Sequence, residues 1–135
     1  MTELRKAHIL MDKENVNAVQ SGSKRGEFFR YGDVVCHDIS VGDEVEIYAH
    51  PEDTLCASAP IKEIRVVKVK DVTLEELREA GYEDAFEFTN KWVVPHVVTH
   101  DEDIVLIRFS MSKLFFRTEF LAGMPSEINF TIARP

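Results

Sequence analysis

The sequence is short of cysteine, glycine and proline, and it has no long apolar run. Its 135 residues include two cysteines, six glycines and five prolines, which excludes a disulfide-rich scaffold and a collagen-like or low-complexity chain. No apolar run approaches the roughly 18–20 residues of a membrane-spanning helix. Residues 1–6 lack the basic flank and apolar stretch of a secretory signal. We therefore expect a cytoplasmic protein that has no contact with membranes.

The cysteines and histidines do not have the spacing of metal ligands. The two cysteines form no CxxC pair, so we expect reduced thiols. A zinc site could be assembled only from Cys36, His37, His50 and Cys56. These residues lack the short paired spacing that zinc sites use. His96 and His100 lie four residues apart, but the glutamate of an HExxH motif is absent. We expect neither a metal site nor a cofactor.

The composition is that of one soluble globular domain with an acidic surface. Hydrophobic residues make up 44% and charged residues 30% of the chain, and no repeat or long linker divides it, so we expect residues 1–135 to form a single domain. The net charge is −8. A body of this charge repels a phosphate backbone, which excludes salt-driven coating of duplex DNA. A nucleic acid could therefore bind only in a local cleft.

The hydrophobic pattern predicts several short strands and two or three short helices. Asp12 can cap a helix that ends at Gly22, and Thr73 with Glu76 forms a capping box. Strands are predicted at 7–11, 44–49, 61–72, 104–109, 114–116 and 128–132, and helices at 12–22, 73–81 and 84–92. The segment 23–30 is predicted to run from a basic loop into an aromatic strand. The strand at 44–49 is expected to face inward at positions 45, 47 and 49, and the strand at 104–109 to be buried on both faces or nearly so. A change of parity predicts a β-bulge near Val66. This order favours an α+β fold built on a small mixed or antiparallel β-barrel.

Charge is concentrated in three short segments. Residues 20–30 carry Lys24, Arg25 and Arg30 against Glu27, residues 61–70 carry a net charge of +3, and residues 71–87 carry one arginine against seven acidic residues. Each segment has a structural explanation, because cations are favourable after a helix C-terminus and on the wet face of an edge strand. Together they place a basic loop in an otherwise acidic chain.

The sequence around this loop resembles the ASCH family of the PUA-like superfamily. The segment VQSGSKRGEFFR at 19–30 is similar to the GxK signature of that family. Four further segments follow in the family's order: the GD turn at 42–43, a long strand at 62–73, a short helix closing on GY at 74–82, and a strand at 104–109. The resemblance covers residues 7–110. We expect the remaining residues, 111–135, to be an extension that packs on the barrel.

The resemblance implies a PUA-like barrel with a cleft beside the GxK loop, of the kind that binds RNA or a nucleotide. The residues expected to contact this ligand are Lys24, Arg25, Glu27, Phe28, Arg30 and Tyr31. The cationic side chains would neutralise phosphate, and Phe28 or Tyr31 would stack on a base. The favoured function is therefore ligand binding without catalysis.

An enzymatic alternative follows from the same resemblance. Some family members are amidohydrolases of acylated cytidine, in which the GxK lysine activates a threonine three positions later and a distal glutamate assists. Lys24 matches the lysine and Glu79 loosely matches the glutamate, but Glu27 stands at the threonine position. A carboxylate is a poor nucleophile toward an amide, although Glu27 could act as a base on water. We predict no deacylation.

A third alternative is a domain that binds another protein and no nucleic acid. Residues 113–121 contain a candidate apolar patch, whose members are Leu114, Phe116, Phe120 and Leu121. An exposed patch of this kind is typical of a partner surface, whereas the same residues packed inward would only extend the core.

Overall fold

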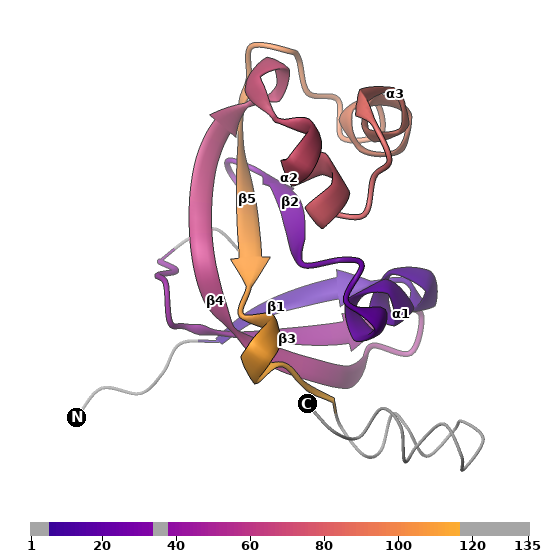
Figure 1. Ribbon diagram of the computed structural model, residues 1–135, viewed down its shortest axis with the longest axis vertical. Coiled ribbons are helices and arrows are strands. Elements are labelled where there is room, and N and C mark those ends of the chain that lie inside the picture. The colour runs from indigo at the N-terminus through magenta and orange to yellow at the C-terminus, as the bar shows by residue number, and fades with distance from the viewer. Residues whose placement is uncertain (1–5, 34–37, 117–135) are drawn as a thin grey trace.

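The computed structural model describes residues 6–33 and 38–116 (Figure 1). The strands are β1 (Lys6–Met11), β2 (Gly26–Arg30), β3 (Glu44–Ala49), β4 (Thr54–Lys68), β5 (Asp103–Phe109) and β6 (Phe115–Phe116). The helices are α1 (Lys13–Ser21), α2 (Leu74–Glu79) and α3 (Ala85–Phe88), and one turn of π-helix at Thr89–Val93 continues α3. No helix within these two ranges is long and apolar enough to cross a membrane.

The strands form one curled, mixed sheet in the order β1-β3-β4-β5-β2, and β6 pairs with β4. β1 and β3 run parallel, and the other pairings are antiparallel. β4 is long and curved, so it carries the sheet from the layer of β1 and β3 to the layer of β5 and β2 (Figure 1). The half-barrel with three short helices confirms the predicted α+β class.

The sheet separates two hydrophobic cores, named here the lower and upper core from their places in Figure 1. The lower core consists of Ala7, Ile9, Met11, Val16, Val19, Val45, Ile47, Ala49, Cys56, Ala57, Ala59, Ile61, Val105, Ile107, Phe109 and Leu114. The upper core consists of Phe28, Val67, Val69, Leu77, Ala80, Phe88, Trp92, Val93, Val98, Ile104 and Leu106. Alternate residues of β5 belong to different cores, which confirms the prediction that this strand is buried on both faces.

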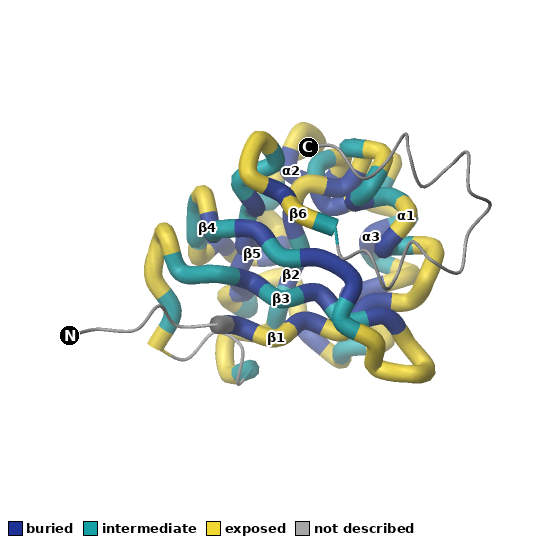
Figure 2. The backbone as a smooth tube through the Cα atoms, turned by 90° about the horizontal axis from the view of Figure 1, so that it is seen from below, coloured by how far each residue is buried: buried dark blue, intermediate teal, exposed yellow. Residues whose placement is uncertain are grey.

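The alternation of β3 shows why the sequence folds as it does in the lower core. Val45, Ile47 and Ala49 are buried, while the residues between them are half-buried (Figure 2). Period-two burial of this kind is typical of a strand with one face on a core. The predicted inward set of β3 is therefore confirmed.

The helix ends also follow the sequence signals. The Asp12 carboxylate accepts a hydrogen bond from the Asn15 amide, and Gly22 adopts a left-handed φ of 86° after α1. The predicted capping box between Thr73 and Glu76 is present at the start of α2. The sequence predicts these helix caps correctly because the interacting residues lie within about one helical turn of each other.

The predicted bulge near Val66 is wrong. Val66 and its successor pair with Val105 and Ile104 in an unbroken ladder, so they simply face opposite sides of the sheet. The irregularity lies earlier, where Lys62 is the extra residue between the pairings of Ile61 and Glu63 with β5. The change of parity in the sequence therefore reflects a strand that contributes to both cores.

The start of the predicted C-terminal extension packs on the barrel. Leu114 is 8% exposed and belongs to the lower core, and Phe115 and Phe116 pair with β4. Phe115 is 54% exposed and Phe116 is half-buried. Phe120, Leu121 and the predicted strand at 128–132 lie outside the described residues, as do Cys36 and His37.

Candidate functional site

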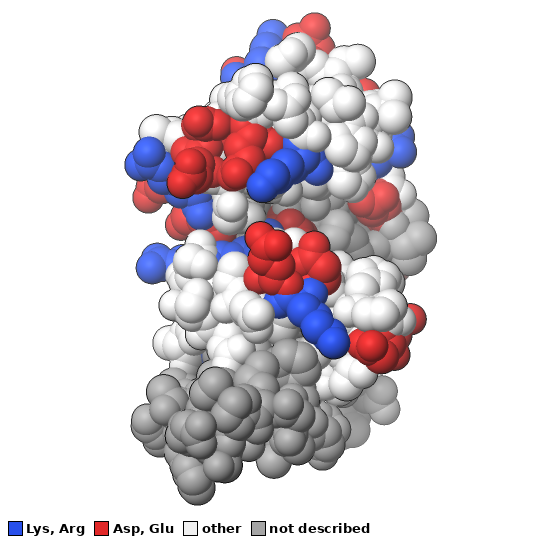
Figure 3. Space-filling model, turned by 90° about the vertical axis from the view of Figure 1, so that its right-hand side faces the viewer, with Lys and Arg blue, Asp and Glu red and all other residues white. Residues whose placement is uncertain are grey.

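Three adjoining hollows follow one another between the end of α1 and the end of α2. Their volumes are about 700, 510 and 390 Å³, and they are named here the acidic, central and basic hollows. Figure 3 shows acidic and basic side chains gathered on both sides of this recess. The acidic and central hollows share Ser23, Leu74 and Arg78, and the central and basic hollows share Gly22, Arg25 and Glu79. The three hollows therefore form one groove, with the central hollow in its middle.

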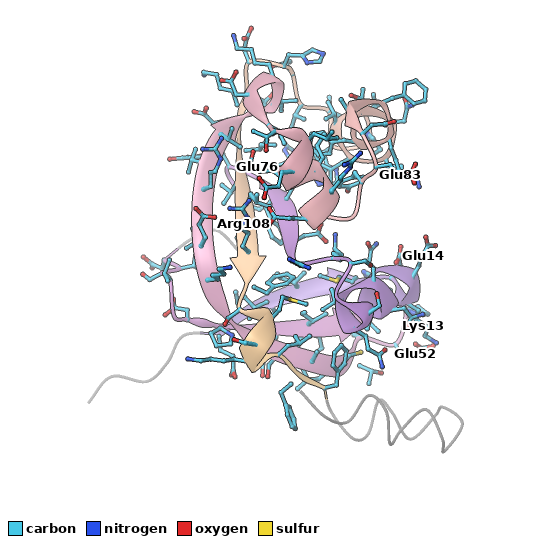
Figure 4. The ribbon with its side chains drawn as sticks, viewed as in Figure 1. Lys13, Glu14, Glu52, Glu76, Glu83 and Arg108 are labelled. Carbon is cyan, nitrogen blue, oxygen red and sulfur yellow. The ribbon has the colours of Figure 1, made fainter. Side chains whose placement is uncertain are left out.

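The acidic hollow is rich in hydrogen-bond acceptors. Glu14 of α1 and Glu83, from the turn after α2, lie on opposite sides of it (Figure 4). Asp84 and the hydroxyl-bearing Tyr82 also line it, and Arg78 is its one basic side chain. The arrangement suits the N–H donors of a polar ligand better than an anion.

The basic hollow has the opposite balance. Arg25, Lys62 and Arg108 line it together with Glu79. Arg108 hydrogen-bonds to Glu63 and Glu79, so its charge is already compensated. Burial lowers the pKa of the Arg108 guanidinium, but the hydrogen bonds to these two glutamates outweigh burial and raise it. The charge available to a ligand is that of the exposed Arg25 and Lys62, which pair with no carboxylate in the described ranges.

Lys24 lies beneath the groove and is 1% exposed. Its ammonium donates hydrogen bonds to the Glu27 carboxylate at 3.0 Å and to the Ala80 carbonyl oxygen at 2.6 Å. The ammonium also lies 5.9 Å from the centre of the Tyr82 ring. Lys24 lines none of the three hollows. It clamps the loop after α1 to the end of α2, where carbonyl groups attract a cation.

The backbone of the same loop is held from two sides. The Arg25 amide donates to the Glu79 carbonyl at 2.6 Å, and the Arg25 carbonyl accepts from the Phe109 amide at 2.9 Å. At Gly26 a Cβ atom would lie 2.8 Å from the Ile107 carbonyl oxygen. Only glycine permits this approach of β2 to β5. The loop that places Arg25 at the groove is therefore fixed by α2 and β5.

Tyr82 keeps its hydroxyl proton in the acidic hollow. Burial raises the pKa of this hydroxyl well above its ordinary value, and the negative charges of Glu27, Glu87 and Asp12 raise it further. The ring packs edge-on against Phe88 at 5.2 Å between centroids. Tyr82 therefore presents a rigidly held, neutral hydroxyl that can both donate and accept a hydrogen bond.

The structure divides the residues that the sequence grouped into one site. Phe28 is 2% exposed and packs against Phe88 and Trp92, so it has no face with which to stack a base. Arg30 and Tyr31 are exposed at the opposite end of β2 and line none of the hollows. Of the predicted ligand contacts, Arg25 alone lines the groove.

The residues of the enzymatic alternative are likewise divided. Lys24 and Glu27 form an ion pair, and the Glu27 side chain is 16% exposed. The Glu79 carboxylate instead hydrogen-bonds to Arg108 and lines the central and basic hollows. Three or more His, Cys, Asp or Glu side chains do not gather into a metal-binding group anywhere in residues 6–33 and 38–116.

Several groove residues were not found from the sequence as ligand contacts. Glu14, Lys62, Arg78 and Tyr82 come from four separate elements or turns, and only the tertiary fold brings them together. A partial signal exists in the sequence, because Lys62 lies in a basic segment and Tyr82 belongs to the GY pair on which the predicted short helix closes. Neither signal indicates which side chains share a groove.

Comparison with known proteins defines the fold. Neither a family model nor a curated protein matches the sequence. The ASCH protein of Zymomonas mobilis is similar in structure, with a TM-score of 0.59 and 20% identity over 77% of this chain and 66% of that chain, just under two thirds of its length. The ASCH domain of Lactobacillus crispatus JV V101 gives a TM-score of 0.55 and 15% identity over 82% of this chain and 81% of that one.

A third similar structure supports the same conclusion. Protein EF3133 of Enterococcus faecalis V583 gives a TM-score of 0.61 and 13% identity, and the alignment covers 84% of each chain. At such identities the likeness defines the fold and no function. The fold expected from the sequence resemblance is confirmed.

Proposed function

Because the chain has the ASCH-domain fold, we propose that it binds a nucleotide, or a short single-stranded RNA segment, in the groove beside the GxK loop and does not transform it. The observation that carries the proposal is the exposed guanidinium of Arg25, which no carboxylate of residues 6–33 and 38–116 pairs with, at a groove that also offers neutral hydrogen-bonding groups. Phosphate and the polar edge of a base need these two kinds of partner.

Arg25 is the strongest candidate for a phosphate contact. Its Nε donates to the Gly22 carbonyl at 3.1 Å, which orients the guanidinium and leaves its other N–H groups available. The backbone of Arg25 is held by both α2 and β5, so the side chain starts from a fixed point. Preorganisation of this kind reduces the entropy lost on binding.

Lys24 contributes by positioning the loop. Its ammonium is committed to Glu27 and the Ala80 carbonyl, so it supports Arg25 without reaching a ligand itself. The same commitment argues against catalysis, because an electrophile must face the reacting carbonyl.

The test is titration of short labelled single-stranded RNA and of nucleoside monophosphates against wild type, Arg25→Ala and Arg30→Ala at low salt. Arg25→Ala should weaken binding by about tenfold, since a charge-assisted hydrogen bond contributes about 1.5–3 kcal/mol. Arg30→Ala is the matched control, because it removes the same charge from the opposite end of β2 and should change binding less than about twofold.

Two results would contradict the proposal. Negligible binding of every probe by the wild type would remove a nucleic-acid ligand altogether. An equal loss in Arg30→Ala and Arg25→Ala would show that binding does not depend on the groove.

A further inference from the structure

The groove has a direction, because its charge changes sign along its length. The acidic hollow presents Glu14, Glu83 and Asp84 against Arg78. The basic hollow presents Arg25 and Lys62, beside an Arg108 whose charge Glu63 and Glu79 compensate. The central hollow, which joins them, is balanced by two arginines and two glutamates. A ligand that fills the groove therefore meets an anionic environment at one end and a cationic environment at the other.

We infer that the groove binds a single nucleotide in one orientation, with its phosphate in the basic hollow and its base in the acidic hollow. The base favoured there is one with an exocyclic amino group. This inference rests on the proposed function and specifies the ligand: a free mononucleotide, or the terminal nucleotide of a strand, and not a strand that passes through.

The basic hollow has the groups that a phosphate needs. Arg25 and Lys62 bring two cations from the loop after α1 and from the bulge of β4, and neither has a carboxylate partner in the described part of the chain. Ser110 and Ser112 line the same hollow and carry hydroxyl donors. A phosphate that takes charge-assisted hydrogen bonds from an arginine and a lysine gains more than it would from neutral donors.

The acidic hollow favours a base for the complementary reason. Carboxylates are acceptors only, so Glu14 and Glu83 can receive N–H donors of an exocyclic amino group, as acidic side chains do when they read cytosine. The Tyr82 hydroxyl can serve the remaining donor or acceptor of the base edge. Uracil offers carbonyl acceptors where the amino group would be, and these would face the carboxylates unfavourably.

The same carboxylates exclude a second phosphate. A strand running through the whole groove would place its next phosphate near Glu14 and Glu83, which lie on opposite sides of that end (Figure 4). Like charges at contact distance repel strongly where protein excludes part of the solvent. The acidic hollow therefore terminates the ligand.

The experiment is calorimetric titration of a nucleoside, its 5′- and 3′-monophosphates and its 3′,5′-bisphosphate, each with adenine, cytosine or uracil as base. The better monophosphate should bind at least about tenfold more tightly than the nucleoside. The bisphosphate should bind no more tightly than that monophosphate, and the uracil compounds should bind several-fold more weakly than the adenine or cytosine compounds.

Two variants test which hollow binds the phosphate and which binds the base. Lys62→Ala should weaken the monophosphate about fivefold and leave the nucleoside unchanged, whereas the control Lys70→Ala, on an exposed lysine paired with Asp101, should change neither. Glu83→Gln should reduce the preference for an amino-bearing base and improve binding of the bisphosphate. Unchanged melting temperatures of these surface variants confirm that folding is not involved.

The outcomes separate this inference from the function on which it rests. A bisphosphate or a trinucleotide that binds more than about fivefold better than the best monophosphate overturns the orientation and leaves nucleic-acid binding intact. Equal affinities of nucleoside and monophosphate overturn the phosphate position. Absence of binding by all probes, the RNA included, overturns both proposals.

Discussion

The two cores of this protein differ in the kinds of side chain that they bury. The lower core is mainly aliphatic and draws on α1 and on strands that alternate buried and half-buried residues. The upper core is organised around Phe28, Phe88 and Trp92, with Tyr82 at its edge. Helices as short as α2 and α3 bring few residues to a core, and each large aromatic side chain buries a large area. Three such rings pack against one another in the upper core, whereas Phe109 is the one aromatic residue among the buried members of the lower core.

The groove lies where these two cores meet. α1 belongs to the lower core and α2 to the upper core, and β5 contributes alternate residues to both. The Lys24 ammonium joins the loop after α1 to the carbonyl of Ala80, a member of the upper core. The width of the groove therefore depends on how the cores are held relative to one another. The predictions below break one core, then the contact between them, and then test the groove itself.

The largest effect is expected from Phe28→Ala in the upper core. Loss of a buried phenylalanine costs about 3–5 kcal/mol, and this ring is 2% exposed between Phe88 and Trp92. Trp92 is the single tryptophan, so its fluorescence reports on the upper core, while far-UV circular dichroism reports mainly on the sheet. In Phe28→Ala the fluorescence transition should precede the dichroism transition during denaturation.

The matched variant for that experiment is Ile47→Ala in the lower core, where Ile47 is fully buried. Because the upper core packs on strands that the lower core supports, the fluorescence and dichroism transitions should shift together. The expected loss in the free energy of unfolding is about 2–5 kcal/mol. Coincident transitions in Phe28→Ala would contradict the separation of the two cores. A shift of the fluorescence transition alone in Ile47→Ala would contradict the dependence of the upper core on the lower core.

These features show which parts of the molecule the sequence could predict. The caps of α1 and α2 and the inward face of β3 depend on residues within a few positions of one another, and they were predicted correctly. The family resemblance places the ligand beside the GxK segment, and Phe28 was expected there for that reason. The two adjacent phenylalanines of β2 give no indication of which one is buried. β2 contributes to both cores, so the alternation that identifies other strands is absent there.

The candidate site was less predictable for a different reason. The sequence predicts Lys24 as a ligand contact, but the position of its ammonium depends on Ala80, which is 56 residues away in the sequence. The charge gradient likewise combines Glu14, Lys62 and Glu83 from separate elements. Long-range proximity of this kind has no local signal, whereas a basic loop in an acidic chain does.

A smaller effect is expected from Lys24→Met, which breaks the contact between the cores while keeping the buried side-chain volume. The change leaves the Ala80 carbonyl and the Glu27 carboxylate without their common donor, and we expect a loss of about 2 kcal/mol in the free energy of unfolding. The measurement is urea denaturation followed by fluorescence and circular dichroism.

The double variant Lys24→Met/Glu27→Gln provides the control for this prediction. Glutamine removes the uncompensated charge, so the double variant should recover about half of the stability lost in Lys24→Met. Additive losses in the two single variants would instead show that the pair is not coupled. Ligand affinity should fall in Lys24→Met even at temperatures where the protein is folded, because Arg25 loses its support.

The last prediction is an expected absence, and it tests whether the groove is a binding site or an active site. Purified protein should release no acyl group from acylated cytidine above background. A deacylase must bring a nucleophile or an activated water within about 3 Å of the amide carbonyl. Glu27, which stands where the amidohydrolases of similar sequence pattern have a threonine, is paired with Lys24 at 3.0 Å, and Glu79 is bonded to Arg108.

Chromatographic detection of the cytidine that deacylation would release, with Glu27→Gln and Lys24→Ala as comparison variants, decides this point. Turnover that disappears in Glu27→Gln would contradict the prediction and make Glu27 the base that activates water. Turnover that survives Glu27→Gln but is lost in Lys24→Ala would contradict it differently, because a hydroxyl group near the clamp would then be the nucleophile. The geometry argues against both results, since the ammonium of Lys24 is committed to two partners beneath the groove and Lys24 lines none of the three hollows.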